Sequence, residues 1–150
     1  MKGKCLCGSV TIVAPSRRQV GGCHCDACRR WGGGPAFAIE CGSDVEIHGR
    51  EHVESYRSSD WAERGFCRRC GTHLYYRYLP RSTYAIPAGI FGDVEGLELS
   101  HQLFIDRKPP YYALANETAT LSHDEAMSAI RKDRADAAAE PKQGDGPGAG

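Results

Sequence analysis

Short runs in which apolar and polar residues alternate dominate the first 121 positions of the chain. In "CLCGSVTIV", Leu6, Val10 and Ile12 alternate with Cys5 and Cys7 and with small polar residues. This period of two is that of a β-strand, whose successive side chains point to opposite faces. The pattern predicts a strand over residues 5–13 with both thiols on one side.

Similar runs recur along the chain and make it a mainly β protein. Two of them flank residues 48–51 in "DVEIHGREHVESY", which predicts a hairpin. Three more strands are expected from "THLYYRY", "STYAIP" and "ELSHQLFI", which are rich in aromatic and β-branched residues. The one helical signal in this part is "DACRRW", with Asp26 as its expected N-cap and Gly32–Gly34 as its end.

The pattern changes after residue 121, so we expect two parts: a domain over residues 1–121 and an appendage over residues 122–150. Ser122 and Glu125 have the spacing of a capping box and precede an Ala-rich, charged stretch, which predicts a short helix. From Pro141 the sequence is rich in Gly and Pro without a large apolar residue. Such a composition predicts a disordered tail.

Charge and composition exclude several classes of protein. Lys plus Arg and Asp plus Glu both number 19 in 150 residues, so the formal net charge is zero. A balanced charge argues against nucleic-acid and anionic-membrane partners. No apolar run is long enough to span a membrane, and "MKGKCLCG" lacks the apolar segment of a signal peptide. We therefore expect a cytoplasmic protein, whose oligomeric state the sequence leaves open.

Eight cysteines are many for such a chain, and a reducing compartment favours metal ligands over disulfides. Cys5 and Cys7 form one pair, and Cys67 and Cys70, followed by Gly71, form a second. Two such pairs complete a tetrahedral four-thiolate zinc site. The pairing predicts a closed, structural zinc that ties the start of the chain to its middle.

Cys23, Cys25 and Cys28 remain as a third cluster. Three protein ligands with one open position are typical of catalytic zinc. Cys41 could supply a fourth thiolate and close this site, which would make both ions structural. We favour the open site because Cys41 is a lone cysteine after the alternating "AFAIE", where a thiol commonly packs as a small apolar residue.

Four motifs in this order resemble the glutathione-dependent formaldehyde-activating enzyme family, which also contains the centromere protein V type proteins. The motifs are "GKCLCGSV", "GCHCDACRRWGG", "GFCRRCGTHLYY" and "HQLFIDRKPPYY", and they span residues 3–113. The resemblance implies a β-tent fold of short antiparallel strands, stabilised by two zinc ions per chain. It assigns Cys5, Cys7, Cys67 and Cys70 to a structural zinc and Cys23, Cys25 and Cys28 to an active-site zinc.

The resemblance also implies an activity, the joining of formaldehyde and glutathione into S-(hydroxymethyl)glutathione, which is carbon–sulfur lyase chemistry. Glutathione carries two carboxylates, which need cationic partners. The candidates for contacts with this thiol substrate are Arg29, Arg30, Arg64 and Lys108, with Trp31 as an apolar wall and His101 for proton transfer. His24 lies between two ligands and should point away from the metal, and His73 reads as a packed residue.

Two functions stay open at this point. The first is a zinc-dependent enzyme that acts on glutathione adducts. The second is a non-catalytic, zinc-stabilised binding module with a macromolecular partner, as the centromere-associated relatives suggest. The rate of adduct formation with and without the protein separates the two.

Overall fold

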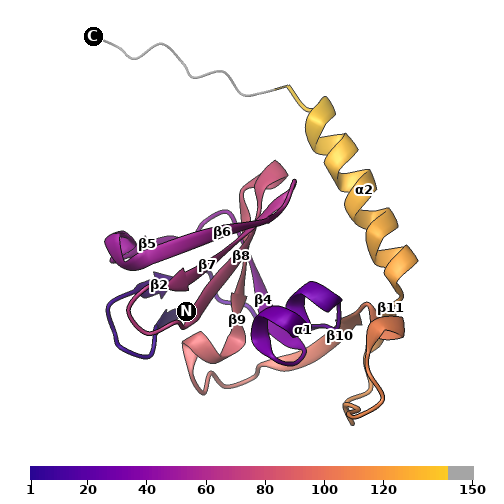
Figure 1. Ribbon diagram of the computed structural model, residues 1–150, viewed down its shortest axis with the longest axis horizontal. Helices are drawn as coiled ribbons and strands as arrows, with labels where there is room; N and C mark the ends of the chain where they lie inside the picture. Colours follow the sequence, from indigo (N-terminus) through magenta and orange to yellow (C-terminus); the bar gives the residue numbers. More distant parts are fainter. Residues whose placement is uncertain (142–150) are drawn as a thin grey trace.

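The computed structural model describes residues 1–141, which form two β-sheets, two α-helices and four 3-10 turns (Figure 1). The small sheet has the strand order β1-β2-β5 and the large sheet β11-β10-β3-β4-β9-β8-β7-β6. The strands are β1 (Lys2–Lys4), β2 (Thr11–Val13), β3 (Gln19–Cys23), β4 (Ala36–Gly42), β5 (Glu46–His48), β6 (Val53–Ser59), β7 (Ala62–Cys67), β8 (His73–Tyr78), β9 (Thr83–Pro87), β10 (Glu98–Leu103) and β11 (Ala119–Leu121). The helical elements are α1 (Asp26–Gly32), α2 (His123–Ala139), η1 (Arg50–His52), η2 (Leu79–Arg81), η3 (Ala88–Phe91) and η4 (Ile105–Arg107).

The mainly β class is confirmed, but the strands are not all antiparallel. β10 pairs in parallel with both β3 and β11. A parallel neighbour needs a long crossover connection, and residues 104–118 supply it between β10 and β11. The alternating pattern of "ELSHQLFI" predicts a strand without indicating its direction.

The single strand expected over residues 5–13 is wrong. β1 ends at Lys4, and the chain then turns through Cys5–Gly8 before β2 begins at Thr11. Gly8 has φ 77°, and its N–H donates to the Cys5 carbonyl at 3.0 Å. A positive φ suits glycine because it has no Cβ, so Gly8 allows a tight turn inside the alternating pattern. The two thiols therefore lie on a turn rather than along a strand.

The hairpin expected around residues 48–51 is also wrong. β5 pairs with β2 in the small sheet, whereas β6 pairs with β7 in the large one. Gly49 has φ 80° and lies where the chain leaves β5 of the small sheet for β6 of the large sheet. A Cβ at this position would lie 2.0 Å from the Ser9 carbonyl oxygen, so only glycine fits there. The two runs thus belong to different sheets.

The core fills the space between the two sheets. Val20, Ile39 and Ile86 of the large sheet pack in one cluster with Ile12 and Ile47 of the small sheet. Side chains alternate along a strand, so the intervening residues of β3, β4 and β9 face the other way. That second face of the large sheet has no sheet over it and is called the open face below.

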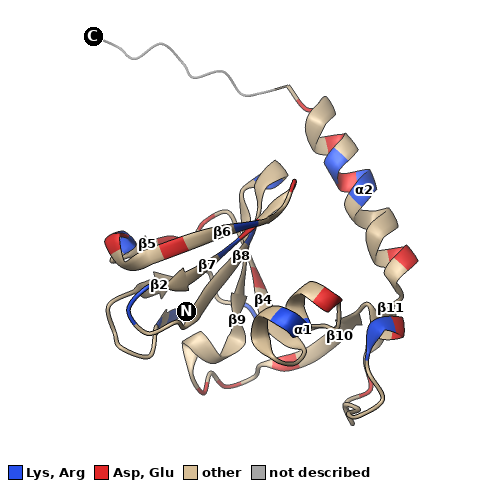
Figure 2. Ribbon diagram, viewed as in Figure 1, with Lys and Arg blue, Asp and Glu red and all other residues tan. Residues whose placement is uncertain are grey.

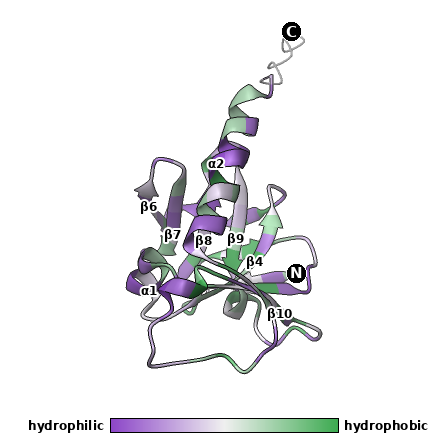
Figure 3. Cartoon of the chain, turned by 90° about the vertical axis from the view of Figure 1, so that its right-hand side faces the viewer, coloured by the Kyte–Doolittle hydropathy of each residue, from purple (hydrophilic) through white to green (hydrophobic). Residues whose placement is uncertain are grey.

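The helix expected after residue 121 is confirmed as α2, which has 17 residues, and its predicted capping box is confirmed as well. The Ser122 hydroxyl accepts from the Glu125 N–H, and the Glu125 carboxylate accepts from the Ser122 N–H. Arg81 ties the helix to the body through Asp133 at 2.6 Å and Glu140 at 3.0 Å. α2 stands in front of β8 and β9 in Figure 3. The predicted tail falls almost entirely on residues 142–150, outside the described residues.

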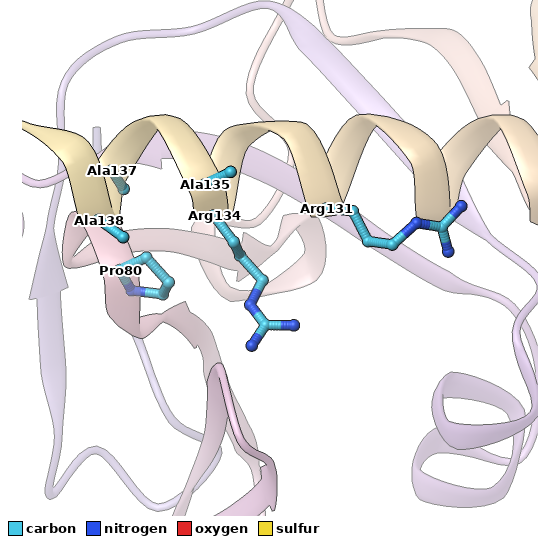
Figure 4. Close-up of a pocket in the computed structure, with 6 residues that line it drawn as sticks. All are labelled: Pro80, Arg131, Arg134, Ala135, Ala137 and Ala138. Carbon is cyan, nitrogen blue, oxygen red and sulfur yellow. The ribbon is translucent and has the colours of Figure 1, made fainter.

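The surface between α2 and the body is an open groove of about 500 Å³, lined by Pro80 and by small and basic residues of the helix (Figure 4). Basic and acidic residues are interspersed along the ribbon, α2 included (Figure 2). Within residues 1–141 no helix is long and apolar enough to cross a membrane.

Candidate metal centres

The first candidate centre holds four thiols. The sulfur atoms of Cys5, Cys7, Cys67 and Cys70 all lie within 4.8 Å of one another. Cys7 Sγ lies 3.6 Å from Cys5 Sγ and 3.8 Å from Cys67 Sγ. Four thiolates at about 2.3 Å from a zinc ion in a tetrahedron are separated by about 3.8 Å. The four sulfur atoms therefore fit one zinc ion.

Two turns build this centre. The Cys5–Gly8 turn brings one pair, and the turn between β7 and β8 brings the other, where the Gly71 N–H donates to the Cys67 carbonyl at 2.7 Å. The Leu6 N–H donates to Thr72 Oγ1 at 3.0 Å and joins the two turns directly. Residues more than sixty positions apart in the sequence thus meet at one point.

Neighbouring hydroxyl groups help these thiols to ionise. The Thr72 hydroxyl lowers the pKa of Cys70 to about 5, and the Ser9 hydroxyl lowers the pKa of Cys7. Burial acts in the opposite direction and raises the pKa of Cys67. The thiolate is the form that binds metal, so the lowered pKa values of Cys7 and Cys70 favour metal binding at this centre.

The second candidate centre holds three thiols, those of Cys23, Cys25 and Cys28, within 4.8 Å of one another. Cys23 ends β3, and Cys28 lies in the first turn of α1. Asp26 was expected to cap this helix, but Cys25 is the N-cap, with its sulfur accepting from the Cys28 N–H at 3.3 Å. The same Cys25 side chain therefore caps α1 and is a member of the thiol cluster.

Cys41 lies outside this cluster. It is buried in the core between the sheets, and its thiol donates to the Ile39 carbonyl at 3.3 Å. On β4, Ala36 is the residue next to Cys23, and Ala36 and Cys41 lie on opposite faces of the sheet. The second centre is therefore a three-thiol cluster, with the open position that three ligands leave on a tetrahedral ion.

Charge is concentrated at the three thiols. Hydrogen bonds from Cys23 and Cys28 hold the pKa of Cys25 at about 2, and the same contact with Cys25 raises the pKa of Cys23. Buried Arg64, on β7, points Nη2 at Cys28 Sγ from 3.6 Å. One zinc ion and three thiolates carry a net charge of −1, which the guanidinium offsets. Arg64 was expected to contact substrate, and it contacts a ligand.

An aromatic wall stands beside this cluster. Trp31, at the end of α1, stacks on His73 with ring centroids 4.6 Å apart and meets Phe66 edge-on at 5.8 Å. Burial and the nearby Arg64 both lower the pKa of His73, so the wall stays neutral. Trp31 packs here as a side wall.

Other predicted contacts lie elsewhere. Arg29 donates to the His24 carbonyl at 2.9 Å and pairs with Asp26, so it braces the start of α1. Lys108 donates to the Tyr112 carbonyl at 2.6 Å and is occupied by the backbone. Arg30 is exposed on α1 and has no side-chain partner among residues 1–141.

His24 is fully buried, and both of its ring nitrogens are bonded away from the metal cluster. Nε2 lies 2.8 Å from Gln102 Oε1 and Nδ1 lies 2.5 Å from the Tyr112 hydroxyl. The Gln102 oxygen only accepts, so Nε2 carries the proton and Nδ1 accepts from Tyr112. This hydrogen-bonded chain fixes the loop between two ligands, a role that sequence reasoning did not identify.

His101 and Glu40 lie on the open face. The His101 ring covers Gly21, where a Cβ would lie 2.6 Å from its Nε2, and its Nδ1 bonds Ser100 Oγ at 2.8 Å. His101 and Glu40 line one groove with Arg17 and Arg18. Glu40 was not expected at a site, although the alternation in "AFAIE" places it on the face of Ala36 and Ala38.

We expect Arg64→Gln to weaken zinc binding at the three-thiol centre by about 10- to 100-fold, as loss of a group next to a ligand commonly does. The reason is the unbalanced negative charge that the change leaves at Cys28. Competition with a chromophoric chelator measures the effect. Arg30→Gln, an exposed change nearby, is the matched control, and equal losses in both variants would contradict this role of Arg64.

Comparisons with known proteins identify relatives of this chain. The model of the glutathione-dependent formaldehyde-activating enzyme family matches residues 1–107. An uncharacterised lyase of Schizosaccharomyces pombe is 37% identical over 133 residues, which are 87% of this chain and 97% of the relative. A Halomonas elongata protein named for glutathione-dependent formaldehyde activation is 28% identical over 124 residues, 74% of this chain and 78% of that protein.

A solved structure supports the fold as well. The crystal structure of a Rhodobacter sphaeroides protein superposes with a TM-score of 0.54 at 29% identity, over 63% of this chain and 91% of that one. The match of the family model covers both cysteine centres, Arg64 and the groove on the open face. The chain belongs to the glutathione-dependent formaldehyde-activating enzyme family.

Proposed function

We propose that this protein is a zinc-dependent carbon–sulfur lyase that forms S-(hydroxymethyl)glutathione from formaldehyde and glutathione. The observation that carries the proposal is the three-thiol centre, to which no fourth thiol of residues 1–141 belongs. The names of the relatives, a lyase and a formaldehyde-activating protein, support the same chemistry.

The three thiols of the centre share one task, and Cys25 has a second one. Cys23, Cys25 and Cys28 would hold the zinc, and Cys25 also caps α1, so that the cluster keeps its shape. Zinc bound there supplies an open coordination position that favours a thiol in its thiolate form. Three thiolates leave the ion little charge with which to polarise a carbonyl, so we infer that the centre positions the thiol.

The surrounding residues manage charge and water. Arg64 supplies a positive charge at Cys28, which favours the arrival of a further negative sulfur. Trp31, three residues after Cys28 on α1, stacks on His73, and this aromatic pair would limit the access of water to the reacting carbon. The exposed Arg30 is free for a substrate carboxylate.

The bond changes balance without a further reagent. The glutathione sulfur attacks the formaldehyde carbon, and a carbon–sulfur bond forms while the carbonyl π pair moves to oxygen. The proton lost by the thiol ends on that oxygen and completes the hydroxymethyl group. The reverse sequence releases formaldehyde, so the same groups serve both directions.

Exchange-resolved NMR tests the proposal. Formaldehyde and glutathione are mixed with and without the zinc-loaded protein, and the rate of exchange between free and adduct signals is compared. We expect acceleration that scales with protein concentration. An unchanged rate would reject the catalytic proposal, and it would favour a zinc-stabilised binding module instead.

A further inference from the structure

The groove that Glu40 and His101 line lies on the open face, and none of the seven thiols of the two metal centres is among its lining residues. Its volume is about 470 Å³, and its walls come from the start of β3, the middle of β4 and β10. The lining residues are mostly charged or polar: Ser16, Arg17, Arg18, Gln19, Glu40 and His101. A groove of this size and polarity suits one end of a small polar ligand.

Strand register connects this groove to the three-thiol centre. On β4, Ala36 lies beside Cys23, and Ala38 lies beside Gly21. Glu40 follows on the same face, and Ala85 of β9 lies beside it. The path between the centre and the groove on β4 and β9 is therefore lined by alanines, and the His101 ring over Gly21 forms its side, so an extended ligand would lie along β4 next to His101.

Strand register connects Glu40 with the sulfur cluster by a second line across the sheet. Ala85 lies beside Glu40, Tyr76 lies beside Ala85, and Arg64 lies beside Tyr76. Arg64 in turn reaches Cys28 Sγ at 3.6 Å. The groove and the three-thiol centre therefore belong to one face of the large sheet.

Glu40 and the two arginines offer opposite charges in one groove. The Glu40 carboxylate has no hydrogen bond or ion pair with another residue of the described chain 1–141. It reaches solvent but is surrounded by groove residues, and this partial burial raises its pKa. Within the same residues, the Arg17 guanidinium donates only to the neighbouring Ser16 carbonyl, at 3.4 Å. Unpaired groups of both signs match a zwitterion.

We propose that this groove binds the α-amino-acid head of a γ-glutamyl thiol, with Glu40 on the ammonium and Arg17 and Arg18 on the carboxylate. The inference rests on the proposed function, since it places the thiol of the same molecule at the three-thiol centre.

The dimensions agree with one extended molecule. The five residues of β4 from Ala36 to Glu40 span about 13 Å. The thiol and the ammonium of an extended γ-glutamylcysteine are roughly 10 Å apart by standard bond lengths. The Glu40 side chain covers the remaining distance.

His101 gives the groove its wall. The Ser100 hydroxyl donates to the Val20 carbonyl at 3.3 Å, so it accepts from His101 Nδ1–H at 2.8 Å. This leaves Nε2, beside Gly21, as an acceptor that faces the ligand path. We assign His101 to the amide N–H groups of the peptide, a positioning contact.

Binding measurements on the zinc-loaded full chain test the inference. Isothermal titration compares glutathione with N-acetylglutathione, which lacks the ammonium, and with S-methylglutathione, which lacks the free thiol. For the wild type we expect N-acetylation to weaken binding about tenfold, the effect of one charged hydrogen bond. Glu40→Gln should bind glutathione about tenfold more weakly than the wild type does, and it should bind N-acetylglutathione as well as it binds glutathione. Glu46→Gln, on a strand of the other sheet, is the matched control and should behave as the wild type.

S-methylglutathione separates this inference from the proposed function. Its binding should also depend on Glu40, since the groove acts without the free thiol. If the protein does not accelerate formaldehyde addition but Glu40→Gln still removes the preference for glutathione over N-acetylglutathione, only the proposed function fails. The inference is overturned if the wild type binds glutathione and N-acetylglutathione equally well, or if Glu40→Gln leaves the ratio of these two affinities unchanged. Tighter binding of free glutamate than of S-methylglutathione also overturns it, because the groove would then serve the free amino acid.

Discussion

Cys67→Ser is expected to leave the protein unfolded at room temperature. Cys67 is fully buried and shares its centre with Cys5 and Cys7, which come from the start of the chain. Binding of a structural zinc supplies about 10–16 kcal/mol in small zinc domains, whereas a whole domain is stable by only about 5–15 kcal/mol. Loss of one ligand therefore removes most of the net stability. Far-UV circular dichroism and the recovery of soluble protein measure the result.

Cys41→Ser is the matched control for this experiment. Cys41 is equally buried but lies outside both metal centres, and a serine hydroxyl can keep the bond to the Ile39 carbonyl. We expect this variant to fold and to keep its zinc, with a cost of about 1–3 kcal/mol for a buried hydroxyl. A folded Cys67→Ser protein that still holds two zinc ions would contradict the assignment of the four-thiol centre.

Cys25→Ser is expected to fold, to bind one zinc ion in place of two, and to lose all acceleration of adduct formation. Serine is a preferred N-cap, so its hydroxyl can accept from the Cys28 N–H and keep α1 in place. A hydroxyl is a poor zinc ligand, which leaves Cys23 and Cys28 as a pair that cannot hold the ion. Zinc analysis together with the NMR exchange rate measures both effects.

Cys25→Ala provides the contrast, because it removes the ligand and the cap together. We expect the alanine variant to be less stable than the serine variant by about 1 kcal/mol, the usual value of an N-cap, with the same loss of zinc. If Cys25→Ser unfolds as readily as Cys67→Ser, the three-thiol centre is structural, and the catalytic proposal loses its basis.

Local patterns predicted the local features of this chain. The capping box at Ser122 and Glu125 depends on residues three positions apart, and the strand nature of "THLYYRY" depends on residues within one run. The grouping of the cysteines in pairs also survives in the structure, because a turn with two thiols is a local unit.

Features that depend on distant partners could not be read in the same way. The strands on either side of Gly49 look like one hairpin, but each finds a better partner in a different sheet. The parallel pairing of β10 follows from where residues 104–118 return, which no short pattern records. Glu40 was missed because an exposed glutamate on a strand is ordinary until the groove around it is known.

The hydrogen bonds around His24 show that residues beyond the family match support the three-thiol centre. Its partners Tyr112 and, through Gln102, Thr118 lie beyond residue 107, where the match to the family model ends. A protein trimmed at that boundary would keep every thiol and yet leave a buried imidazole without its hydroxyl partner, between two of the three ligands. The segment up to Thr118 thus holds the loop of Cys23–Cys25 in place. We therefore expect that the shortest part of this chain able to fold with its metal centre extends beyond the residues that match the family model.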